Sequence, residues 1–188
     1  PLIFETGEIA RQTNASVVVK QGDTLVISTL CTDKTATEPQ DFLPMRVDYL
    51  EKFSAAGRTS GGYFKTEGKP KDDEILTARL IDRPIRPSIN KSYYDDIQLI
   101  NTVWSYDPNN KPDVLAICAS SAAIALSDIP QRCITAAVRI GKINDQLVIN
   151  PSEANLEKST LDMILAGSKD AVLMIEGHCD FLTDDEVL

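Results

Sequence analysis

The stretch PDVLAICASSAAIALSDIP, residues 112–130, decides how this chain folds. It begins at a proline, which is favoured in the first turn of a helix, and nearly all of its residues are small or apolar. A helix that is apolar on every side lies in a protein interior, and small side chains let neighbouring elements approach it closely. We therefore expect a buried helix packed against a β-sheet.

Short runs with β-strand character lie on both sides of this helix. Residues 15–20 (ASVVVK) and 24–30 (TLVISTL) flank a glycine-containing turn, which predicts a hairpin. Residues 42–50 (FLPMRVDYL) alternate between apolar and polar, so one face of this strand should be wet. Further strands are expected at residues 2–6, 96–104, 134–140, 146–150, 161–166 and 171–176. The pattern predicts one α+β domain, in which a mixed or mostly antiparallel β-sheet is packed with two α-helices.

The second helix should run from residue 72 to about residue 82. Three acidic residues at its start suit a helix N-terminus, and Pro84 disfavours helical geometry at Arg83. The preceding residues 54–72 form an irregular, glycine-containing stretch rich in Lys and Arg. A loop of this length is unusual in a compact domain unless it has a function.

Charge is distributed unevenly along the 188 residues, whose formal net charge is −9. Residues 46–91 hold ten Lys and Arg against seven Asp and Glu, a net +3, whereas the segments on either side are acidic. An acidic surface opposes promiscuous polyanion binding, but a confined basic strip can still hold a polyanion in one place.

Other features of the composition limit the protein class. No stretch approaches the roughly 18 apolar residues of a membrane span, and the first residues do not resemble a secretory signal. We therefore expect a soluble, intracellular protein without a membrane partner. The four cysteines form no C-x-x-C pair, so buried, reduced thiols are the expectation.

Three arginines carry the strongest binding signal. Arg79 and Arg83 are four residues apart, which places them on one helical face, and Arg86 follows in the stiff segment RPIRP. Converging guanidinium groups can bind phosphate oxygens bidentately. Equally, Asp82 and the acidic helix start could hold these arginines in structural ion pairs.

The glycine-containing loop adds a second component. In GGYFKTEGK, Tyr63 and Phe64 stand beside Lys65 and Lys69. Aromatic rings interleaved with basic residues are typical of single-stranded nucleic acid binding, because bases stack on the rings while cations follow the backbone. The alternative is an aromatic plug that only packs against the domain.

Three other patterns are weaker. GRTSGGYFK lacks the G-K-[ST] ending of a P-loop. His178, Cys179 and Asp180 are the residue types of a cysteine triad, but chain neighbours in a strand point to opposite sides. The acidic pairs at 95–96 and 184–185 could hold a hard cation, although such pairs are usually only solvated.

Five segments together resemble the first RNase PH-like core domain of the polynucleotide phosphorylase (polyribonucleotide nucleotidyltransferase) family, in its bacterial or organellar form. They are FETGEIARQTNASVVVKQGDT, FLPMRVDYLEKFSAAGRTSGGYFKTEG, ARLIDRPIRP, PDVLAICASSAAIALSDIP and LDMILAGSKDAVLMIEG. The resemblance covers essentially the whole chain and implies the RNase PH-like (ribosomal protein S5 domain 2-like) fold for residues 1–188. The chain would then be a fragment of a longer protein that also has a helical domain, a second core, and KH and S1 domains.

The resemblance also implies a function. Family members are 3′-to-5′ exoribonucleases of mRNA decay that use inorganic phosphate and magnesium, release nucleoside diphosphates, and form homotrimeric rings around an RNA channel. Degradosome partners are possible, and the expected location is the bacterial cytoplasm or, alternatively, a mitochondrion or plastid. The channel loop of the family matches Tyr63, Phe64 and Lys65, and its basic block matches the three arginines. Thr66 stands where a second basic residue is usual.

The resemblance places the chemistry outside this chain, so no catalytic or metal-binding residue is assigned. SYDPNNKPDV, before the small-residue helix, lacks the serine-rich phosphate loop of the family's catalytic core. Asp162 matches one of its acidic residues, but Leu156 and Ile164 stand where another aspartate and a lysine are expected. Metal-assisted displacement needs such groups. The alternatives are a non-catalytic RNA-binding scaffold of an exosome-like ring, or a small-molecule kinase, which the absence of a glycine- and serine-rich phosphate loop disfavours.

Overall fold

The computed structural model describes residues 1–34, 41–61, 63 and 67–183. Within these ranges, two β-sheets enclose two long helices. The first sheet contains β1 (Leu2–Thr6), β2 (Ala15–Gln21), β3 (Thr24–Asp33), β5 (Asp96–Ser105) and β4 (Met45–Glu51), in that spatial order. The second contains β7 (Gln146–Ile149), β6 (Ala136–Ile143), β8 (Leu161–Gly167) and β9 (Val172–Cys179).

The first sheet is mixed, as expected. Strands β1, β2, β3 and β5 are antiparallel neighbours, whereas β4 pairs with β5 in parallel. The tight turn between β2 and β3 needs Gly22, whose φ is +57°, because a Cβ there would lie 2.5 Å from Asn110 Nδ2. The second sheet is entirely antiparallel. The separation of the strands into two sheets was not part of the sequence prediction.

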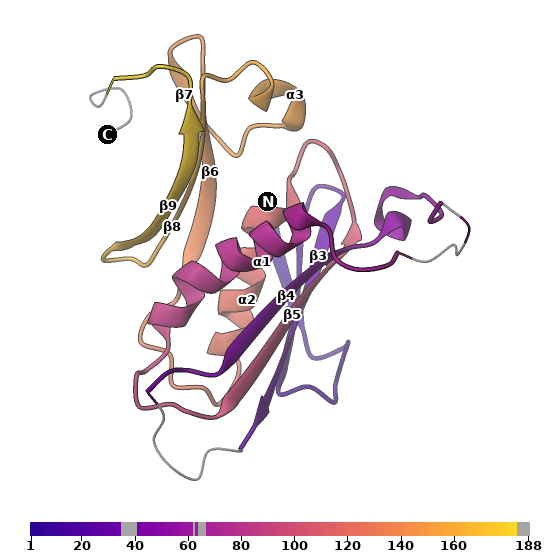
Figure 1. Ribbon diagram of the computed structural model, residues 1–188, viewed down its shortest axis with the longest axis vertical. Coiled ribbons are helices and arrows are strands. Elements are labelled where there is room, and N and C mark those ends of the chain that lie inside the picture. Colours follow the sequence, from indigo (N-terminus) through magenta and orange to yellow (C-terminus); the bar gives the residue numbers. More distant parts are fainter. Residues whose placement is uncertain (35–40, 62, 64–66, 184–188) are drawn as a thin grey trace.

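Helix α2 (Pro112–Ala125) is the predicted buried helix. It packs on β2 and β3 of the first sheet and on β6 of the second, so α1 and α2 lie between the two sheets (Figure 1). Its polar groups are satisfied inside: the Ser120 hydroxyl donates to Asn101 Oδ1 at 2.9 Å, and the Thr135 N–H donates to Ser121 Oγ at 2.8 Å. Small side chains therefore allow close packing without leaving these groups unpaired.

Helix α1 (Asp72–Ile85) is longer than predicted. The expected end near residue 82 was wrong, because the helix continues through Pro84 to Ile85. Ile81, Pro84 and Ile85 are all buried, and the Arg86 N–H still bonds to the Asp82 carbonyl. Burial of these apolar groups outweighs the hydrogen bond that proline cannot make.

Several smaller elements complete the fold. The strand expected from residue 42 begins only at Met45, after Pro44, and β6 begins at Ala136 and extends to Ile143. One-turn helices occur at η1 (Phe53–Ala56), η2 (Arg86–Ser88) and α3 (Glu153–Leu156). No helix among the described residues is long and apolar enough to cross a bilayer.

Candidate nucleic-acid interface

A shallow pocket lies between α1 and β4, where the predicted arginines begin. Its volume is about 300 Å³, and Arg79 and Arg86 both line it. The pocket also has an acidic side, formed by Asp48, Glu74 and Asp82. The structure therefore brings two of the three arginines to one place, together with carboxylates that compete for them.

Arg86 is held by contacts inside the fold. Its Nε and Nη2 donate to the two carboxylate oxygens of Asp82 at 3.0 and 2.7 Å. Its Nη1 and Nη2 also donate to the carbonyls of Leu43 and Met45, at 2.8 and 3.0 Å. This is the structural ion pair that the sequence left open, and it fastens the end of α1 to the start of β4.

Arg83 points to the second sheet. Its Nη1 lies 2.6 Å from Glu176 Oε2 on β9, and both side chains are more than half exposed. An exposed pair of this kind contributes little to stability, so Arg83 can exchange Glu176 for another anion at small cost.

Arg79 differs from both. It is exposed on α1, and within the described part of the chain no carboxylate forms an ion pair with it. A guanidinium in this position has its donors available for a ligand from solution.

The described parts of the loop between β4 and α1 project away from both sheets (Figure 1). The Tyr63 side chain is 94% exposed, which argues against a packed plug at this residue. Phe64 and Lys65 lie outside the described residues, as does Thr66. Lys69 is exposed and lines a second pocket, of about 250 Å³, at the base of the loop.

Two glutamates that the sequence analysis did not assign to this site lie at the base of the loop. Glu67 Oε1 accepts the Phe53 N–H at 2.7 Å, while its Oε2 lies 2.9 Å from Lys52 Nζ. The Lys52 side chain and then the Phe53 N–H lower the pKa of Glu67 below its ordinary value. Glu74, which is buried, accepts the N–H groups of Glu51 and Lys71, each at 2.7 Å. One signal was available: Glu67 is the only acidic residue between Lys52 and Lys71 in the sequence.

The positions that the resemblance aligns with the family's catalytic residues are occupied by groups engaged in the fold. Both carboxylate oxygens of Asp162 accept bonds from Arg139 Nη1, at 3.0 and 2.8 Å. Arg139 Nη2 also donates to Asp113 at 2.5 Å, at the start of α2. Ile164 is buried in the core, and Leu156 lies in α3. A guanidinium thus neutralises the carboxylate that a metal would need.

The segment before α2 is held together by hydrogen bonds to the Asp107 carboxylate. Asp107 accepts the Asn109 N–H at 2.9 Å and a bond from Asn110 Nδ2 at 2.7 Å. These bonds, the Asn109 N–H first, lower the pKa of Asp107. The segment therefore presents a carboxylate, which would repel phosphate.

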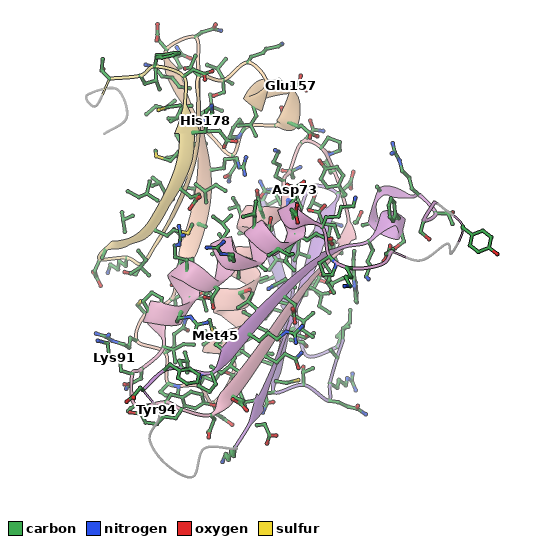
Figure 2. All side chains as sticks on the ribbon, in the orientation of Figure 1. Met45, Asp73, Lys91, Tyr94, Glu157 and His178 are labelled. Carbon is green, nitrogen blue, oxygen red and sulfur yellow. The ribbon has the colours of Figure 1, made fainter. Side chains whose placement is uncertain are left out.

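The weaker candidates do not assemble into sites. His178 lies on β9, far from the start of α1 where Asp73 stands (Figure 2), and its Nε2 is 3.4 Å from Asp180 with both side chains exposed. No group of three or more His, Cys, Asp or Glu residues in the described ranges could hold a metal ion. The acidic pair at 184–185 lies outside these ranges.

The cysteines correct one expectation. All four are free thiols, but Cys31 and Cys179 are exposed, so the prediction of burial was wrong for these two. Both stand near the ends of their strands, β3 and β9. Cys118 is buried in α2, and this burial raises the pKa of its thiol.

Comparison with known proteins places these features in context. Residues 1–130 match the family model "3′ exoribonuclease family, domain 1", and residues 133–188 match "3′ exoribonuclease family, domain 2". The chain is 55% identical over 187 residues to a polyribonucleotide nucleotidyltransferase of Chlamydia muridarum and 54% identical to that of Protochlamydia amoebophila. These alignments cover all of the chain but only 27% of each relative.

The fold has a solved counterpart. The crystal structure of rice (Oryza sativa) Rrp46 superposes with a TM-score of 0.76 and 16% sequence identity, covering 100% of this chain and 84% of that one. At this identity the match concerns the fold alone. It confirms the predicted α+β architecture of the RNase PH type.

Proposed function

Because the chain belongs to the 3′ exoribonuclease family, and within it resembles the first core region of bacterial polyribonucleotide nucleotidyltransferases, we propose that it is the RNA-guiding half of a phosphorolytic nuclease. The whole enzyme would degrade RNA from the 3′ end and release nucleoside diphosphates. The observation that carries this proposal is that Arg79 and Lys69 are both exposed cations in a chain of net charge −9. We propose that they belong to one basic strip.

The proposed role follows from the chemistry of the strip. Arg79 donates hydrogen bonds to phosphate, Lys69 supplies a mobile cation, and the ring of Tyr63 offers a surface on which a base can stack. Arg83 joins them when phosphate displaces Glu176. Because the rest of the chain is acidic, RNA would be repelled elsewhere and directed to this strip. Phe64 and Lys65 are proposed to extend it, as the resemblance implies.

Arg86 has a structural role in the proposal. Four of its hydrogen bonds already go to Asp82 and two backbone carbonyls. Its net positive charge is largely balanced by Asp82. We propose that it shapes the strip by fixing α1 to β4 and adds little direct contact with phosphate.

Magnesium and the phosphate co-substrate are proposed to bind outside this chain. The described residues do not fit a metal, since Arg139 already engages the carboxylate of Asp162. For the same reason we assign no catalytic residue here. The chemistry belongs to the second core domain that the resemblance implies.

The wider setting is also proposed from the family. We expect single-stranded RNA as the substrate, a homotrimer in the full protein, possible degradosome partners, and a bacterial cytoplasmic location or, alternatively, an organellar one. The exosome-like scaffold remains the competing function, but the sequence relatives named above are all nucleotidyltransferases.

The experiment that tests whether this chain binds RNA without cleaving it uses the chain of 188 residues. Incubated with labelled single-stranded RNA, inorganic phosphate and magnesium, it should bind the RNA and release no nucleoside diphosphate. Release of nucleoside diphosphate by the pure chain would show that the catalytic centre lies within it and would refute the proposal.

A further inference from the structure

The base of the loop between β4 and α1 has the composition of a second contact for RNA. Its pocket of about 250 Å³ is lined by Phe53 and by four basic side chains, Lys52, Arg58, Lys69 and Lys71. Phe53 is 36% exposed, and Lys71 Nζ lies 5.3 Å from the centre of its ring. An accessible ring with cations around it is the arrangement on which bases of single-stranded nucleic acids stack.

Carboxylates in the same pocket are already used by the protein. Glu67 is bonded to the Phe53 N–H and to Lys52, and Glu74 is bonded to the N–H groups of Glu51 and Lys71. Glu51 in turn accepts the Tyr49 hydroxyl at 2.8 Å. These acidic groups therefore build the pocket, and their lone pairs are partly satisfied by N–H and O–H donors.

The remaining cations face solution. Arg58 and Lys69 are exposed, and neither forms an ion pair with another described residue. The Arg58 backbone is fixed, because its N–H donates to the Phe53 carbonyl at 2.9 Å. The backbone of Arg58 is thus tied to the same short turn that presents the ring, while its side chain is exposed.

From these contacts we infer a further RNA subsite at the base of the loop: Phe53 stacks on one base, Arg58 binds a neighbouring phosphate, and Glu67 is the positioning residue that holds the Phe53 N–H and Lys52. The inference rests on the proposed RNA-binding function. It adds a binding site distinct from the tip of the loop. It also gives the Glu67 carboxylate a positioning role in a site that binds a negatively charged ligand.

The direction in which removing Glu67 changes RNA affinity distinguishes a positioning role from a simple charge effect. If charge alone mattered, removing Glu67 would strengthen RNA binding, because a negative group would be lost near phosphate. If Glu67 positions Phe53 and Lys52, its removal weakens RNA binding. Asp73 provides the matched control, since it is an exposed acidic residue at the start of α1 (Figure 2), whereas the side-chain bonds described at Phe53 and Lys52 go to Glu67.

The test uses equilibrium binding of single-stranded oligoadenylate to the full natural protein, with an abasic oligomer of equal length as second probe. Phe53→Leu should weaken oligoadenylate binding about fivefold, the value of one lost stack, and leave abasic binding unchanged. Arg58→Gln should weaken both probes and lower the salt slope by about 1. Glu67→Ala should weaken oligoadenylate binding, whereas Asp73→Ala should leave it equal or stronger.

Two outcomes would overturn the inference. One leaves the proposed RNA-binding function intact, and the other refutes it as well. If Arg79→Ala weakens RNA binding but Phe53→Leu and Glu67→Ala do not, the subsite is absent while the proposed function stands. If none of these variants changes RNA binding, the proposed function fails as well. The melting temperature of each variant is measured alongside, so that weaker RNA binding in a variant that is still folded reports positioning and not unfolding.

Discussion

Replacing Arg86 should destabilise the fold and leave the RNA phosphate contacts largely intact. The side chain makes two hydrogen bonds to the Asp82 carboxylate and two to the backbone carbonyls of Leu43 and Met45. Arg86→Ala would remove all four bonds and leave a half-buried carboxylate without its partner.

The magnitude follows from the exposure of the pair. Loss of hydrogen bonds to a charged group costs about 1.5–3 kcal/mol when the site is buried. The Arg86 and Asp82 side chains are 39% and 30% exposed, so solvent screens part of that loss. We expect a loss of about 2 kcal/mol, which for a chain of this size lowers the melting temperature by about 4–8 °C.

Thermal unfolding of the 188-residue chain, followed by circular dichroism, measures this effect. Arg86→Lys keeps the positive charge but cannot form the bidentate pair and the two carbonyl bonds together, so it should lose most of the same stability. Arg79→Ala is the control and should melt within about 1 °C of the wild type, because its side chain is exposed. If Arg86→Ala melts with the wild type, the structural reading of this guanidinium is refuted.

Two further predictions concern titratable groups. The exposed thiols of Cys31 and Cys179 should react with iodoacetamide well before Cys118, whose burial raises its thiol pKa; equal rates, measured by mass spectrometry, would contradict the described burial. Because the pKa of Glu67 lies below its ordinary value of 4.5, its bond to the Phe53 amide should persist as the pH falls through 4.5 and be lost only at lower pH. Amide exchange at Phe53 measures this, and loss of protection already above 4.5 would exclude it.

Local patterns in the sequence predicted much of the fold. Short runs with β-strand character located most of the strands, period-two alternation indicated the one that begins at Met45, and the small, apolar residues of 112–130 predicted the buried helix α2. Local rules failed where distant packing decided the outcome. Pro84 should have ended α1, but burial of its neighbours against the sheet keeps the last turn helical.

The sequence predicted which residues make up the candidate site, but it did not predict the hydrogen-bond and ion-pair partners of each residue. The spacing of Arg79, Arg83 and Arg86 predicted a shared basic strip. It could not show that Arg86 reaches carbonyls more than 40 positions away, or that Arg83 meets Glu176 on the second sheet. Spacing along one helix specifies which face a residue occupies, whereas its partner depends on the tertiary packing of other elements.

The account depends most on the claim that Arg79 is an accessible phosphate contact. The direct measurement is RNA affinity as a function of salt concentration, for the wild-type full natural protein and for Arg79→Ala. We predict that the substitution weakens binding similarly for all RNA sequences and lowers the slope of log affinity against log salt by about 1, with no change in melting temperature. An unchanged affinity and an unchanged slope would contradict the account.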